Sequence, residues 1–132
     1  MKNKKILITG GLGFAGKHFY KSQINKWKKI VIYDKSTYAA DKKFIDQLFN
    51  KDKDQIVKGD ILDSKKLKKI IDKNTCVVHF AAESHVDNSF ETSLIFTRTN
   101  TLGTHKLLEI CRLKKPHKII IISTDEVYGE SV

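Results

Sequence analysis

The 132-residue sequence has little cysteine and proline, and it contains no long hydrophobic run. Its two cysteines, Cys76 and Cys111, lie far apart in regularly patterned segments, which argues against a disulfide scaffold and favours a reducing cytoplasm. We expect both to be buried small hydrophobic side chains. The longest apolar run, residues 119–122, has the length of a strand rather than the ~18–20 residues of a membrane helix. Glycines follow the basic N-terminal segment closely, so we expect no signal peptide and no membrane partner.

Arginine is also scarce, which limits what the positive charge can mean. The chain has 25 lysines and arginines against 15 acidic residues, yet only Arg98 and Arg112 are arginines. Arginine is the residue that reads guanine edges and stacks on bases, and no aromatic residues alternate with the lysine pairs as on a single-strand-binding surface. We therefore expect a solvated, lysine-rich surface and no nucleic-acid partner. A steep salt dependence of DNA binding would indicate the opposite.

The sequence does contain an alternation of strand-like and helix-like segments. A hydrophobic fraction of 40% suits one domain with a packed core. The expected strands are residues 4–9, 30–33, 55–58, 76–80 and 118–122; the expected helices are 14–26, 41–49, 63–71 (capped by Asp63 or Ser64) and 94–113. This order predicts an α/β fold, a Rossmann-like doubly wound parallel sheet with strand order 3-2-1-4-5.

Three glycines, Gly10, Gly13 and Gly16, follow the first expected strand in the spacing G-x-x-G-x-x-G. At such a corner, the first glycine permits a tight turn, the second lets a pyrophosphate approach the main chain, and the third lets the helix pack on the strand. The phosphate charge would meet unpaired N–H groups at the positive end of the helix dipole. A purely structural turn is the alternative, but the position between strand and helix predicts a dinucleotide site.

An acidic residue, Asp34, ends the second expected strand. A carboxylate there can accept hydrogen bonds from the adenosine ribose and would repel a 2′-phosphate, so the sequence favours NAD over NADP, although the neighbouring Lys35 weakens that inference. Asp60 follows the third strand and could reach the adenine amino group; an ordinary Asp turn is the alternative.

Two adjacent carboxylates, Asp125 and Glu126, follow the last expected strand. Two acids in one cleft can have different pKa values and act as acid and base, whereas a solvated loop pair is the alternative. We expect no metal site, because the histidines form no ligand set and strand alternation puts Cys76 and His79 on opposite faces. The glycine motif, Asp34 and this pair all fall at carboxyl ends of strands, where such sheets bind ligands.

Six segments together resemble one enzyme family, in the same order along the chain. They are ILITGGLGFAG (6–16), YDKSTYA (33–39), GDIL (59–62), VVHFAAESHVD (77–87), TNTLG (99–103) and ISTDEVYG (122–129). They resemble the nucleotide-sugar 4,6-dehydratases of the extended short-chain dehydrogenase group. The glycine motif is common to the whole group, whereas AAESHVD and STDEVYG are more specific. Epimerases of the group usually lack the Asp-Glu pair.

The resemblance implies a site for NAD within residues 1–132, read as an incomplete Rossmann domain without a substrate domain. The implied cofactor-binding residues are Gly10, Gly13, Phe14, Ala15, Gly16, Asp34, Lys35, Ser36, Thr37, Asp60, Ile61, Phe80, Ala81, Ala82, Glu83, Ser84 and Thr99. Ser84 and Thr124 match contacts to the sugar nucleotide. Thr124 also belongs to the implied catalytic set, with Asp125 as general acid and Glu126 as general base.

The implied reaction converts a nucleotide-activated glucose, such as dTDP-glucose, to its 4-keto-6-deoxy sugar. NAD⁺ would oxidise the C4 hydroxyl to a ketone, which acidifies the C5 proton. Glu126 would remove that proton, and Asp125 would protonate the departing C6 hydroxyl. NADH would then return its hydride to C6, which regenerates the cofactor within one turnover.

The chain departs from the family pattern in several residues and in length. Ala15, Lys17-His18 and Asn88 differ from the residues common at those positions. The family's Tyr-x-x-x-Lys element, which assists C4 oxidation, would lie downstream, so we expect the 132 residues alone to have little or no dehydratase activity. A non-catalytic NAD-binding module or remnant and another extended short-chain enzyme, such as an epimerase, are the alternatives. The nucleotide stays open, as does the oligomeric state, for which a homodimer through residues 94–113 is one candidate.

Overall fold

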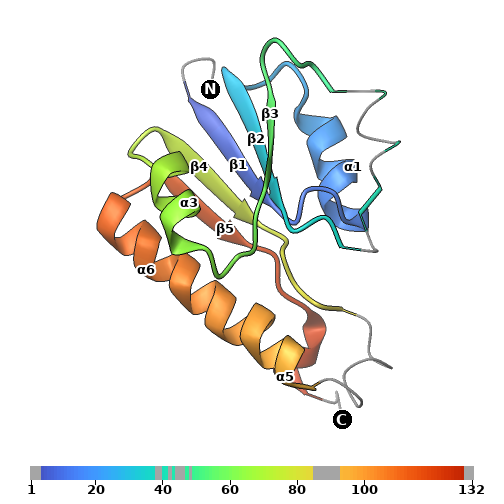
Figure 1. The fold of residues 1–132 in the computed structure, drawn as a ribbon, viewed down its shortest axis with the longest axis vertical. Helices are drawn as coiled ribbons and strands as arrows, with labels where there is room; N and C mark the ends of the chain where they lie inside the picture. Colours follow the sequence, from blue (N-terminus) through green and yellow to red (C-terminus); the bar gives the residue numbers. More distant parts are fainter. Residues whose placement is uncertain are drawn as a thin grey trace.

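The computed structural model describes residues 4–37, 40–41, 43, 47, 49–84 and 93–129. Within these residues, a single sheet has the strand order β3-β2-β1-β4-β5, and every neighbouring pair is parallel (Figure 1). The strands are β1 (Lys5–Thr9), β2 (Lys29–Asp34), β3 (Gln55–Lys58), β4 (Thr75–His79) and β5 (Lys118–Ile121). The predicted fold class and strand order are confirmed.

Helices cover both faces of the sheet. The helix α1 (Phe14–Gln23) lies on one face, and α3 (Ser64–Ile70) and α6 (Thr104–Lys114) lie on the other (Figure 1). The short helix α5 (Ser93–Phe96) and the π-helical segment η1 (Thr97–Gly103) lead into α6, and a 3₁₀ turn, η2 (Asp125–Tyr128), follows β5. The predicted helix at 41–49 falls largely outside the described residues. Across the described part of the chain, no helix has the length and apolar character needed to span a membrane.

Local chemistry explains where these helices begin and end. The first helix stops at Gln23, earlier than predicted: Ile24 already has a ψ of 134°, and Asn25 has a φ of 65° that a right-handed helix does not accommodate. The helix α3 begins as predicted, since the Asp63 carboxylate accepts a hydrogen bond from the N–H of Lys66 at 3.1 Å. The predicted long helix at 94–113 is present, but the sequence did not predict its π-helical segment.

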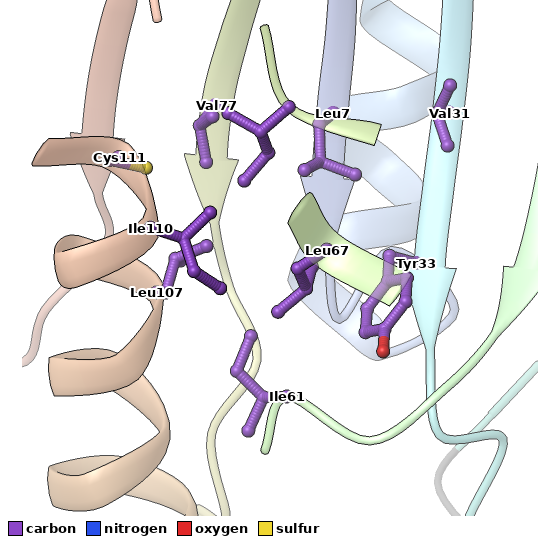
Figure 2. Packing of buried hydrophobic residues seen from close by; sticks show 10 residues of the cluster. Leu7, Val31, Tyr33, Ile61, Leu67, Val77, Leu107, Ile110 and Cys111 are labelled. Atoms are coloured by element: carbon purple, nitrogen blue, oxygen red, sulfur yellow. The ribbon is translucent and has the colours of Figure 1, made fainter. Parts of the chain in front are cut away.

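Strand alternation divides the core into two layers. Ile6 and Ile8 of β1 pack with Tyr20 of α1 on one face, while Leu7 faces the other. There it joins side chains from neighbouring strands and from both covering helices (Figure 2), a cluster that comprises Val31, Tyr33, Ile61, Leu67, Ile71, Val77, Leu107, Ile110 and Cys111. Cys76 and Cys111 are both free and buried, as predicted. Burial raises the pKa of Cys111 to about 11, so its thiol stays protonated at neutral pH.

Candidate functional site

A cleft of about 600 Å³ opens at the carboxyl ends of the parallel strands. It gathers segments that follow all five strands together with one residue of η1. Most residues predicted from the sequence line it: Gly10, Gly13, Phe14, Ala15, Gly16, Asp34, Lys35, Thr37, Asp60, Ile61, Phe80, Ala81, Ala82, Glu83, Ser84, Thr99 and Thr124. The structure therefore brings the separate motifs to one place.

The three motif glycines, Gly10, Gly13 and Gly16, differ in how strictly the fold requires a glycine at each position. Gly10 has a φ of 68°, and a Cβ there would lie 2.7 Å from the main-chain nitrogen of Ala81. A Cβ on Gly16 would overlap the carbonyl oxygen of Gly10. Gly13 is different, because it has a φ of −72° and its Cβ would meet only that same oxygen, at 3.3 Å. The fold thus requires Gly10 and Gly16, whereas a Cβ on Gly13 would make one tight contact, with a main-chain oxygen, and would otherwise occupy the open space beside the start of α1.

This open space adjoins main-chain donors. Gly13 is the N-cap of α1 and offers no side chain to cap it. The first N–H groups of an α-helix have no partner within the helix, and the helix dipole adds a positive partial charge there. Phe14 and Ala15, the first two residues of α1, line the cleft at this point. The turn consequently offers an anion a site built from main chain.

The carboxylate of Asp34 is fixed by two main-chain donors. Its Oδ2 accepts from the N–H of Leu12 at 3.0 Å, and its Oδ1 accepts from the N–H of Ser36 at 2.7 Å. The first bond ties the end of β2 to the glycine turn. Each carboxylate oxygen has a further lone pair, so Asp34 can also accept from two vicinal hydroxyls. Ser36 contributes its main chain to this arrangement and is not among the residues that line the cleft.

Asp60 lies across the cleft from the glycine turn and is also held in place. Its Oδ1 accepts from the N–H of Leu62 at 2.9 Å, and its Oδ2 forms an ion pair with Nζ of Lys35 at 3.0 Å. The hydroxyl of buried Tyr33 donates to the carbonyl oxygen of Asp60 at 2.8 Å. Burial by itself raises the pKa of Asp60, but the bond from Leu62 and the nearby charges of Lys35 and Arg98 outweigh it and hold that pKa below its usual range.

Asn100, on η1, clamps the loop that follows β4. Its Oδ1 accepts from the N–H of Glu83 at 2.8 Å, and its Nδ2 donates to the carbonyl oxygen of Glu83 at 2.9 Å. Both hydrogen-bonding groups of one loop residue are thus satisfied by one side chain. Asn100 lies in the segment TNTLG, of which only Thr99 is a predicted cofactor-binding residue. Its π-helical setting is one that recurs at functional sites.

A buried histidine at the end of β4, just before the same loop, links β1 to α6. One nitrogen of His79 hydrogen-bonds Oγ1 of Thr9 at 2.6 Å, and the other hydrogen-bonds Oγ1 of Thr104 at 2.9 Å. Burial lowers the pKa of His79 to about 4, so the ring is neutral near pH 7. Cys76 packs instead in the cluster beneath α1, so the two side chains do face opposite sides of β4. In the described ranges, no three His, Cys, Asp or Glu side chains are grouped to hold a metal ion.

The predicted catalytic pair begins the turn η2, next to the cleft-lining Thr124. The side chains of Asp125 and Glu126 lie outside what the structure describes, so their roles stay predictions. Other lining residues were not selected from the sequence, namely Tyr33, Ala40, Gly59, Ile122 and Ser123. Gly59 could have been selected because it lies in the family-like segment GDIL, and a Cβ there would overlap the ring and hydroxyl of Tyr33.

A comparison with known families identifies the chain's relationship. The family model described as GDP-mannose 4,6 dehydratase matches residues 7–132. The chain belongs to this family. The expected resemblance to nucleotide-sugar 4,6-dehydratases is thereby confirmed over almost the whole sequence.

Individual relatives agree with this assignment. The dTDP-D-glucose 4,6-dehydratase of Dictyostelium discoideum is 44% identical and aligns with 98% of this chain and 31% of its own length. A solved dTDP-glucose 4,6-dehydratase double mutant from Streptomyces venezuelae, with NAD bound, is 32% identical, with a TM-score of 0.89 over 96% of this chain and 41% of the other. The UDP-glucose 4-epimerase from Brucella ovis, in complex with NAD, is also 32% identical, with a TM-score of 0.82 over 98% of this chain and 38% of the epimerase chain. The chain thus spans about a third to two fifths of these relatives' lengths.

Proposed function

We propose that this chain is the NAD-binding part of a nucleotide-sugar 4,6-dehydratase that acts on dTDP-glucose or a related activated glucose. The observation that carries the proposal is that Gly13 and Asp34 line the same cleft. Gly13 keeps the start of α1 open: its φ suits any residue, and a Cβ there would meet a single atom, the carbonyl oxygen of Gly10, at a tight 3.3 Å. Asp34 is tied to the same turn through Leu12. A dinucleotide needs both features at this spacing, one for its diphosphate and one for its ribose.

The described residues offer groups that suit each part of NAD, which supports the proposal. The N–H groups at the start of α1 hold the diphosphate, and Asp34 accepts from the adenosine ribose. Asp60 would accept from the adenine amino group, and the cleft-lining loop from Phe80 to Ser84, held by Asn100, would border the nicotinamide half. When bound, NAD supplies the hydride acceptor and donor for the sugar. Relatives crystallised with NAD share this fold, which supports the assignment.

The choice of a dehydratase over an epimerase rests on the pair Asp125 and Glu126. The fold does not discriminate between the two classes, because both share it at high TM-scores. Dehydration needs an acid for the leaving C6 hydroxyl and a base for the C5 proton, and adjacent carboxylates can supply both. We assign these roles to Asp125 and Glu126 respectively, with Ser84 and Thr124 contacting the sugar nucleotide.

The cofactor assignment is tested by calorimetric titration of NAD into the 132-residue chain. We expect saturable binding of one NAD per chain, with ADP as a competitor because it carries the adenosine and diphosphate contacts. The absence of saturable NAD binding by a folded chain would contradict the proposal. The sugar assignment is tested on the longest polypeptide that carries this chain, with dTDP-glucose, UDP-glucose and GDP-mannose compared as substrates. Binding of NAD without turnover of any of them would favour the non-catalytic module.

We also propose that copies of the polypeptide pair through the helical run from α5 to α6. Its side chains Leu94, Ile95, Leu102 and Leu108 are large, apolar and exposed. Sedimentation velocity distinguishes the states, with a dimer expected and its weakening expected for Leu102→Glu. A monomer at all accessible concentrations would contradict this assignment.

A further inference from the structure

Charged side chains of both signs meet at the adenosine end of the cleft. Asp34 and Asp60 supply two carboxylates, and Lys35 supplies an ammonium that pairs with Asp60. Arg98 lies near enough for its charge to act on Asp60. NAD and NADP differ only by the phosphate on the adenosine 2′-oxygen, so the balance of these charges decides which cofactor this end accepts.

The lysine is positioned by its partner, not by its own backbone. Lys35 and Asp60 side chains are 56% and 36% exposed, so their 3.0 Å pair contributes little to folding stability. Asp60 is nevertheless well anchored, by the N–H of Leu62 at its Oδ1 and by the hydroxyl of Tyr33 at its carbonyl oxygen. Because Tyr33 is buried in the sheet, Asp60 offers a fixed negative charge toward which the flexible lysine turns.

We propose that Asp60 is a specificity-determining residue for the cofactor. By pairing with Lys35, it withholds from a 2′-phosphate the cation that directly follows Asp34 in the chain. Lys35, paired in this way, then does not compensate the charge that Asp34 presents to that phosphate. This inference rests on the proposed NAD site and deepens it, because Asp34 alone would leave a neighbouring lysine free to reverse the preference. On this proposal, Lys35 does not offset the preference for NAD that Asp34 confers, because its charge is directed to Asp60.

The test compares four proteins by calorimetry with NAD and NADP at one low ionic strength. They are the unmodified chain, Asp60→Asn, Lys35→Met and the double variant. Asn keeps an Oδ1 acceptor for the N–H of Leu62, while it removes the charge and replaces the Oδ2 acceptor that pairs with Lys35 by an NH₂ group. We expect Asp60→Asn to lower the ratio of the NADP to the NAD dissociation constant about fivefold, the size of one exposed ion pair of about 1 kcal/mol. Lys35→Met is expected to change that ratio by less than about twofold, since the ammonium of Lys35 is already paired with Asp60 in the unmodified chain.

The double variant separates a freed lysine from a simple loss of negative charge. If Lys35 mediates the effect, the ratio returns to that of the unmodified chain, as a double-mutant cycle requires for coupled residues. A gain in relative NADP affinity that persists without Lys35 overturns the proposal, as does an unchanged ratio in Asp60→Asn. Added salt is expected to shrink the gain, because the new contact is exposed.

Two further controls keep the outcomes distinct. Should Asp60→Asn unfold, Asp60→Ser repeats the comparison, since a serine hydroxyl can also accept from the N–H of Leu62. Failure of the unmodified chain to bind NAD overturns the proposed function itself. Tight NAD binding with no shift in the ratio for either Asp60 variant overturns only the role given to Asp60.

Discussion

Replacing Gly13 by alanine separates the glycine that a ligand needs from the glycines that the fold needs. Its φ of −72° is open to alanine, and the added Cβ would meet only the carbonyl oxygen of Gly10, at 3.3 Å. Glycine caps a helix better than alanine, so we expect Gly13→Ala to lower the free energy of unfolding by about 0.5–1 kcal/mol. In Gly16→Ala, the methyl group would overlap that oxygen and lie 2.7 Å from Cα of Gly11, both main-chain atoms. We expect that variant to lose about 1–3 kcal/mol or more.

Gly13→Ala, the less destabilised of the two variants, should lose the most affinity for NAD. The methyl group of Gly13→Ala would project into the space where the diphosphate approaches the N–H groups of α1. Loss of one charge-assisted hydrogen bond costs about 1.5–3 kcal/mol, which corresponds to a dissociation constant about 10- to 100-fold higher. Urea unfolding measures the first quantity and isothermal titration the second.

A destabilised control variant keeps the interpretation clear. Gly129→Ala strains a residue with a φ of 75° that does not line the cleft, so it should lose stability without losing NAD affinity. Undiminished NAD binding by Gly13→Ala would refute the diphosphate site, because that methyl group leaves the ligand no room against the main chain.

Two other predictions concern the residues beneath the loop after β4. Asn100→Ala removes both bonds to the main chain of Glu83, so we expect NAD affinity to fall about tenfold while ADP affinity changes less than about twofold; an equal loss for both ligands would indicate a general structural role. His79 has a pKa of about 4 in the fold, below its usual value of 6.5, so the unfolded state binds the proton more readily. The free energy of unfolding should therefore fall by up to about 3 kcal/mol as pH drops from 6.5 to 4. Denaturant titrations at several pH values should show that His79→Asn lacks this pH dependence of the free energy of unfolding, whereas His105→Asn, at an exposed histidine, retains it. The same pH dependence in His79→Asn as in the unmodified chain would contradict the prediction.

The fold could be predicted because its strands have a strong local pattern. Runs such as KILIT and KIVIYD are β-branched and apolar on both faces, which is typical of buried parallel strands. What local pattern could not predict depends on contacts between distant segments. The π-helical segment before α6 is one example, since its Gly103 packs so closely that a Cβ would lie 2.5 Å from Cγ2 of Ile61.

The position of the candidate site could be predicted for a topological reason. In a parallel sheet, the residues that follow each strand converge on one edge, so motifs far apart in sequence meet there. The sequence could not show how the side chains pair once they meet. The ion pair between Lys35 and Asp60 and the clamp of Asn100 on Glu83 both join residues of different strands or helices. The pairing of Lys35 with Asp60 sets the proposed cofactor specificity, and the clamp of Asn100 holds the loop after β4.

A crystal structure of the chain with NAD would test the central claim most directly. We predict that the diphosphate lies beside Gly13, within hydrogen-bonding distance of main-chain N–H groups at the start of α1, with the adenosine ribose against Asp34. A dinucleotide bound elsewhere, or a glycine turn closed over by its own atoms in the presence of saturating NAD, would contradict the account.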